Sequence, residues 1–153
     1  MKFNKPHFIA SASNEAINQA KKLIAKYGEF DSNEADVLIV LGGDGFMLQA
    51  IKDYMDKKTP FFGLNYGSIG FLMNSVNEED MLTRLESSQS VQVSPLIMTA
   101  YDKDGFFHTA KAINEVSLLR QTHQAAKIKV SIDNRVRLEE LICDGILLAT
   151  PSG

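Results

Sequence analysis

The sequence has little of the chemistry that disulfides and zinc sites require. Cys143 is the single cysteine among 153 residues, so a disulfide framework is excluded. The histidines are scattered, and together with Cys143 they do not form the ligand spacing of a zinc site. They are His7, His108 and His123. The length allows one ordinary domain or two small ones.

Long apolar runs and a large excess of one charge are also lacking. No run approaches the roughly 20 apolar residues that span a bilayer, and the N-terminal residues lack the apolar core of a secretory signal. A formal net charge of -3 argues against a bulk electrostatic hold on nucleic acid, although it leaves nucleotide binding open. With 44% hydrophobic and 23% charged residues, the composition is typical of soluble globular proteins. We therefore expect a cytoplasmic protein that binds neither a membrane nor nucleic acid.

Up to about residue 90, apolar runs alternate with helical patterns. Ser13 is expected to cap the first helix and Gly28 to end it. Strand–helix–strand alternation implies right-handed crossovers and a parallel sheet. The sequence therefore predicts an α/β domain over residues 1–90, an open parallel sheet flanked by helices. The patterns place strands at 7–11, 37–41 and 61–64 and helices at 14–27, 46–54 and 78–85.

After residue 90 the sequence changes to hairpin patterns. Asp104 and Gly105 form a strong turn pair, and a second turn is expected at Asp133 and Asn134. Strict alternation indicates antiparallel strands with one side exposed to water. Strands are expected at 97–102, 106–113, 127–132 and 146–149, with a further one starting near Val136. The predicted fold class is thus α/β plus all-β, with the β-rich antiparallel domain beginning at residue 91.

We expect this second domain, residues 91–153, to be incomplete. The chain stops in the turn residues Thr-Pro-Ser-Gly at 150–153, directly after a predicted strand. A strand that enters such a turn normally leads into further structure. The chain is therefore interpreted as an N-terminal portion of a longer polypeptide.

The most informative motif follows the apolar run 37–41 and consists of Gly42, Gly43, Asp44 and Gly45. Glycines at the end of a buried parallel strand let the backbone approach a ligand and point its N–H groups at phosphate oxygens. A carboxylate in such a turn would bind a metal, accept a proton or cap the next helix. The spacing matches neither a Walker loop nor a Rossmann fingerprint.

Three further segments carry polar or glycine-rich chemistry. Residues 63–72 contain the end of the next predicted strand and the glycine-spaced loop that follows it. The carboxyl-end loops of neighbouring parallel strands lie together where ligands bind. Phe71 in this loop is either a core residue or the wall of an adenine pocket. Asn114 and Glu115 interrupt an apolar strand, so they are either solvated at an edge or read the hydroxyls and base edge of a nucleoside. Asp144, before the final strand, is by itself weak evidence for a turn.

Taken together, segments 42–45, 65–72, 114–115 and 144–153 resemble the NAD kinase family in order and spacing, over nearly the whole chain. Diacylglycerol-type lipid kinases and 6-phosphofructokinases share a tetrad of this kind, without the second loop or the Asn-Glu pair. The resemblance implies an α/β domain, a β-rich domain and an active site in the cleft between them. It also implies a homo-oligomer, commonly a tetramer, in which a neighbouring subunit completes the site.

The resemblance implies phosphoryl transfer from ATP to the 2′-hydroxyl of the adenosine ribose of NAD, giving NADP. Asp44 would be the proton acceptor. Gly42 and Gly43, with Mg²⁺ carried by the nucleotide phosphates, would hold the donor phosphates. Phe71 would lie close to the adenine and Asp144 toward the nicotinamide. The implied NAD-binding residues are Asp44, Gly45, Phe71, Asn114, Glu115 and Asp144.

The chain departs from the family pattern in places. Phe46 and Gln49 stand where the family often has a small hydroxyl residue and a basic residue, and Ile142 stands where a basic residue is common. The family motif also continues beyond Gly153. Two alternatives therefore stay open: the chain taken alone is an inactive nucleotide-binding fragment, or the activity is that of a lipid kinase.

Overall fold

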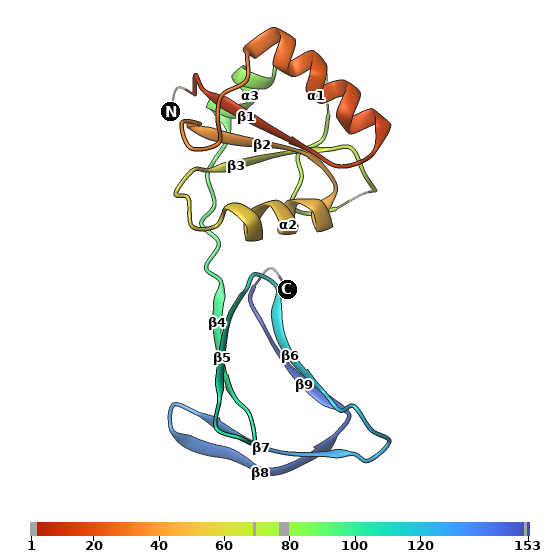
Figure 1. Ribbon diagram of the computed structural model, residues 1–153, viewed down its shortest axis with the longest axis vertical. Coiled ribbons are helices and arrows are strands. Elements are labelled where there is room, and N and C mark those ends of the chain that lie inside the picture. Colours follow the sequence, from red (N-terminus) through yellow and green to blue (C-terminus); the bar gives the residue numbers. More distant parts are fainter. Residues whose placement is uncertain (1–2, 69, 77–79, 152) are drawn as a thin grey trace. The chain divides into compact units, whose positions relative to one another are not determined.

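The computed structural model describes residues 3–68, 70–76, 80–151 and 153. The chain divides into two compact units, Met1–Val91 and Gln92–Gly153. The first unit alternates strands and helices, and the second consists of strands (Figure 1). The elements of the first unit are β1 (Pro6–Ala10), α1 (Asn14–Tyr27), β2 (Val37–Gly42), α2 (Asp44–Tyr54), β3 (Phe61–Asn65) and α3 (Met81–Ser87).

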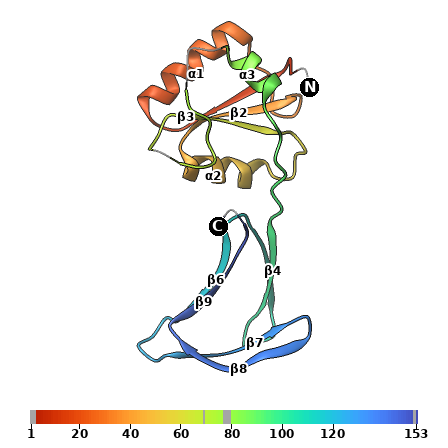
Figure 2. The same cartoon turned by 180° about the vertical axis from the view of Figure 1, so that it is seen from behind.

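The first unit is built on a parallel sheet in the order β1-β2-β3, as predicted. The central strand β2 is buried along its whole length because helices cover both faces. Helices α1 and α3 lie on one face and α2 on the other, which the view from behind also shows (Figure 2). Among the described residues, no helix has the length and apolar character needed to cross a membrane.

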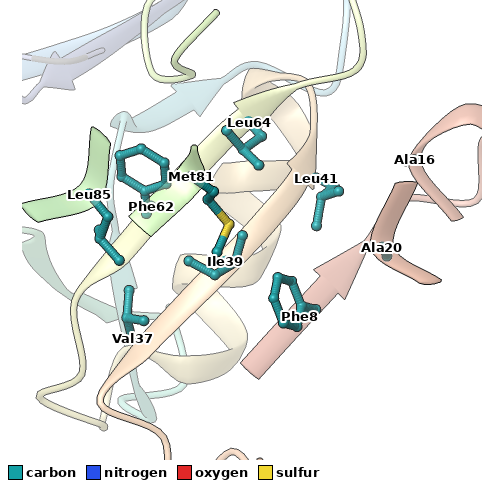
Figure 3. Packing of buried hydrophobic residues seen from close by; sticks show 10 residues of the cluster. All are labelled: Phe8, Ala16, Ala20, Val37, Ile39, Leu41, Phe62, Leu64, Met81 and Leu85. Atoms are coloured by element: carbon teal, nitrogen blue, oxygen red, sulfur yellow. The ribbon is translucent and has the colours of Figure 1, made fainter. Parts of the chain in front are cut away.

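Two hydrophobic clusters hold the helices to the sheet. Alternate residues of β2 point to opposite faces, which divides the apolar side chains between the clusters. The larger cluster packs α1 and α3 against one face (Figure 3), and the smaller packs Met47 and Ala50 of α2 against Val40. The buried members of the larger cluster are Phe8, Ala16, Ala20, Val37, Ile39, Leu41, Phe62, Leu64, Met81 and Leu85.

The helix ends follow local chemistry. The Ser13 hydroxyl oxygen accepts the Ala16 N–H at 3.2 Å, and Gly28 ends α1 with a φ of 81°, so both predicted boundaries are confirmed. Helix α2 begins at Asp44, two residues before the predicted start, because Gly43 occupies the N-cap position. Asp80 caps α3 by accepting backbone N–H groups; the first two residues of the predicted helix 78–85 lie outside the described residues.

The second unit contains three antiparallel strand pairs, β4–β5, β6–β9 and β7–β8, which confirms the predicted antiparallel class. Both predicted turns form: Gly105 has a φ of 85°, and Asp133 and Asn134 have φ values of 51° and 60°. Large apolar side chains such as Ile97, Phe106 and Leu119 are exposed in this unit. Its strands are β4 (Leu96–Tyr101), β5 (Phe107–Ala112), β6 (Glu115–Leu119), β7 (Ala126–Ile132), β8 (Arg135–Cys143) and β9 (Gly145–Ala149).

Candidate functional site

The glycine loops that follow β2 and β3 contact each other through their backbones. The parallel register pairs Gly42 with Asn65, and the Tyr66 N–H donates to the Gly42 oxygen at 2.8 Å. A Cβ atom added at Gly67 would lie 3.0 Å from the Cα of Gly43. The two loops therefore lie side by side at the carboxyl ends of the strands, as expected for neighbouring parallel strands.

Asp44 connects the two loops with its side chain. It is the first residue of α2, but the N-cap is Gly43, and no side-chain capping bond forms within the described residues. Instead, the Asp44 carboxylate accepts the backbone N–H of Phe71 at 2.7 Å and that of Leu72 at 3.1 Å. The interpretation of Asp44 as a helix cap is therefore wrong, because the carboxylate oxygens turn toward the second loop.

The second loop is shaped by Asn65, which sequence reasoning did not single out. Its Oδ1 accepts the Gly67 N–H at 3.0 Å, and its Nδ2 donates to the Ser68 oxygen at 3.2 Å. Asparagine before a glycine-spaced segment is a signal for this kind of turn. Farther along, the Asn74 N–H donates to the Gly63 oxygen at 3.0 Å, so both ends of the loop are attached to β3.

Gly42 and Phe71 occupy very different environments. Gly42 is buried, and an added Cβ would lie 2.8 Å from Cδ1 of the Phe46 ring. The unexpected aromatic residue at position 46 thus packs directly over the strand end.

Phe71 is fully exposed, with a relative accessibility of 102%, so the alternative in which it is a core residue is wrong.

Glu115 is the first residue of β6 in the second unit, and Asn114 directly precedes it. Thr150 holds this point of the backbone: its N–H donates to the Asn114 oxygen at 2.7 Å and its hydroxyl to the Ile113 oxygen at 2.6 Å. The Asn114 Oδ1 atom is buried and has no hydrogen-bond partner among the described residues. The side-chain oxygen of Asn114 is therefore shielded from water, whereas Glu115 is exposed.

Asp144 lies between β8 and β9 and is paired with Arg120. The Arg120 Nε lies 2.5 Å from Asp144 Oδ1, and the Arg120 N–H donates to the Asp144 backbone oxygen at 2.9 Å. Sequence reasoning missed Arg120, because an isolated arginine at a strand end carries no local signal. Ile142, at the position where the family commonly has a basic residue, lies in β8 opposite Lys127.

The described side chains near the two glycine loops do not form a metal-binding centre. Within the described ranges, no group of three or more His, Cys, Asp or Glu side chains is arranged to hold a metal ion. In the second loop, burial raises the pKa of Tyr66.

Comparison with known proteins identifies the family of the chain. Residues 2–88 match the family model described as the ATP-NAD kinase N-terminal domain. The chain is 46% identical over 147 residues to the NAD kinase of Brucella suis, which covers 96% of the chain and 57% of that relative. It is 47% identical over 146 residues to the NAD kinase of Caulobacter vibrioides, covering 95% of the chain and 56% of that protein. For the NAD kinase of Rhizobium meliloti the identity is 48% over 152 residues, covering 99% of the chain and 59% of the relative.

The chain thus spans between 56% and 59% of the length of these curated relatives. The matched segment 2–88 covers more than half of the 153 residues and contains both glycine loops. On these grounds, the chain belongs to the NAD kinase family.

Proposed function

We propose that the protein carrying this chain transfers the γ-phosphate of ATP to the 2′-hydroxyl of the adenosine ribose of NAD, giving ADP and NADP. Family membership supports the reaction class. The observation that carries the proposal is the Asp44 carboxylate, fixed where two glycine loops meet at the carboxyl ends of β2 and β3. Ligands of open parallel sheets bind in this position.

Asp44 is the proposed proton acceptor. A ribose hydroxyl is a poor nucleophile at neutral pH and reacts faster when a positioned base takes its proton. Each carboxylate oxygen of Asp44 accepts one backbone N–H, and each oxygen has two lone-pair sites. One site per oxygen thus stays available for the hydroxyl, while the two N–H bonds hold the carboxylate in one orientation.

The donor phosphates are proposed to bind at Gly42 and Gly43 and the start of α2. Because this helix begins without a side-chain cap among the described residues, its first N–H groups are open to an anion. Phosphoryl transfer depends mainly on positioning and charge neutralisation. The Mg²⁺ of the nucleotide would supply the neutralising charge, and the backbone would supply the positioning.

NAD is proposed to contact Gly45, Phe71, Asn114, Glu115 and Asp144. The buried Asn114 Oδ1 supports this, because an unpaired buried acceptor costs about 1–3 kcal/mol and a donor on the adenine or ribose would satisfy it. Phe71 offers an uncovered aromatic face on which a base can stack. Glu115 is exposed and can accept hydroxyl protons, and Asp144 would lie toward the nicotinamide.

The protein is further proposed to be a cytoplasmic homo-oligomer, with a tetramer as the expected form. The exposed apolar side chains of the second unit support an association surface, since large apolar patches are uncommon on monomers. A binding-only role is the second candidate for the 153-residue chain taken alone, because it spans 57% of the Brucella suis relative.

The test is an assay of NADP formation from NAD and Mg²⁺-ATP, run on the protein at its natural length and on the 153-residue chain. NADP formation by the natural-length protein is expected, and nucleotide binding without turnover by the 153-residue chain would support the binding-only role for it. A parallel assay offers diacylglycerol as acceptor. Lipid phosphorylation without NADP formation would contradict the proposal.

A further inference from the structure

We propose that Gly70 is a positioning residue for Asp44: the missing side chain at position 70 is what allows the carboxylate to dock on the second loop. A Cβ atom added at Gly70 would lie 2.3 Å from Oδ1, 2.4 Å from Cγ and 2.5 Å from Oδ2 of Asp44. Side-chain Cβ atoms essentially never come within 3.0 Å of another heavy atom. Any residue other than glycine therefore displaces either the carboxylate or the loop.

Neither the Asp44 carboxylate nor the second loop can move without breaking hydrogen bonds. The carboxylate is held by the N–H groups of Phe71 and Leu72, so a rotation of the Asp44 side chain breaks both bonds. The loop is attached to β3 at both ends, since the Asn65 N–H donates to the Asn74 oxygen at 2.9 Å and the Asn74 N–H donates back to Gly63. A side chain at position 70 would therefore disrupt the hydrogen bonds of the carboxylate or those that attach the loop to β3.

The requirement for glycine at position 70 is attributed to the side chain of Asp44. An alanine at position 70 would meet the Asp44 carboxyl group before any other part of the described structure, because the three heavy atoms nearest its Cβ all belong to that group. This separates Gly70 from a glycine needed for a turn, where any side chain is unfavourable.

The consequence for the reaction rests on the proposed role of Asp44 as proton acceptor. A general base must lie within about 2.6–3.2 Å of the oxygen atom whose proton it removes, and a displacement near 1 Å lowers the rate by about 10²-fold. The substitution Gly70→Ala is expected to lower kcat by about this factor. The KM for NAD is expected to change less than kcat, because the proposed contacts at Asn114 and Glu115 belong to the second unit and only the neighbouring contact at Phe71 lies in the displaced loop.

The test is a double-mutant cycle between Gly70→Ala and Asp44→Ala, read by Tm and by kcat in the natural-length protein. In the presence of Asp44, Gly70→Ala is expected to lower Tm by several degrees. When Asp44 is replaced by alanine, the clashing carboxyl atoms are gone, and Gly70→Ala is expected to leave Tm unchanged. An equal loss of Tm in both backgrounds, or no loss in either, would overturn the proposal.

Gly105→Ala is the matched control. Its added Cβ meets no described heavy atom within 4 Å, but its φ of 85° disfavours alanine, so its Tm loss should be the same with and without Asp44. If Gly70→Ala alone fails to fold, soluble Asp44→Ala/Gly70→Ala protein supports the proposal and an insoluble double variant overturns it. A third outcome is that the Tm effects of the two substitutions depend on each other while Asp44→Ala keeps its full kcat. This would overturn the catalytic role of Asp44 and leave Gly70 as a packing residue.

Discussion

The carboxylate of Asp44 accepts the backbone N–H of Phe71 at 2.7 Å, although the two residues are 27 positions apart in the chain. This bond joins the start of α2 to the loop that follows β3. It places a charged oxygen at the junction of the two glycine loops with its orientation fixed by the backbone. The expected properties of the site depend on this contact.

Replacing the proposed base should separate catalysis from binding. Asp44→Asn keeps the size of the side chain but removes the proton acceptor, so kcat should fall by ~10²–10⁴-fold, or roughly 3–5.5 kcal/mol of barrier. NAD affinity, measured by calorimetry, should change little. Loss of NAD binding with normal turnover of the bound complex would make Asp44 a binding residue.

Phe71→Ala should weaken NAD binding without destabilising the fold. The side chain is fully exposed, so its removal opens no cavity. Stacking of a base on an aromatic side chain is worth about 1–3 kcal/mol, and the Kd for NAD should rise accordingly. Phe106→Ala is the matched control, because Phe106 is also exposed and lies outside the proposed contacts. Equal Kd values for the two variants would remove Phe71 from the NAD site.

Asn114→Ala should weaken NAD binding at little cost in stability. Its Oδ1 is buried without a described partner, and removing an unsatisfied acceptor does not break a hydrogen bond within the protein. The unfolding free energy, measured by urea titration, should therefore stay nearly the same while the Kd for NAD rises. Unchanged affinity would argue that this oxygen does not face the nucleotide.

The pair of Lys26 and Asp80 should make stability depend on pH in the acid range. The pKa of Asp80 is lowered from its ordinary value of 3.8 to about 2, mainly by the hydrogen bond from Lys26, which measures 2.5 Å. A lowered pKa in the folded state means that the stabilisation is complete above pH 3.8 and is lost as the pH falls toward 2.

The measurement for this pair is Tm as a function of pH for the natural protein and for Asp80→Asn. Since the pair is partly exposed, its contribution is modest and is expected to shrink in high salt. The Asp80→Asn variant should lose less Tm than the natural protein between pH 4 and pH 2. Parallel curves would show that another group controls acid stability.

Much of the fold could be predicted because its signals are local. The apolar run 37–41 indicated a doubly buried parallel strand, and Ser13 and Gly28 marked the ends of α1 through hydrogen bonds within a few residues. The Asp104-Gly105 pair likewise predicted the β4–β5 hairpin, because a positive φ at glycine is a property of the turn itself.

The candidate site was less accessible to such reasoning. The parallel order of the predicted strands indicated that the two glycine loops lie together. The orientation of each side chain could not be predicted in this way. Asp44 was also consistent with a helix cap, and Phe71 with a core residue. Those alternatives differ in contacts between residues far apart in the chain, which local patterns do not contain.

By itself, the sequence determined the alternation of elements, the parallel and antiparallel classes, and the family to which the chain belongs. Tertiary structure alone decided that Asp44 turns to the N–H groups of Phe71 and Leu72, that Gly70 leaves room for it, and that the Asn114 oxygen is buried. The reason is physical: a strand or turn is set by neighbours in the chain. The direction and burial of a side chain are set by whatever distant backbone packs beside it.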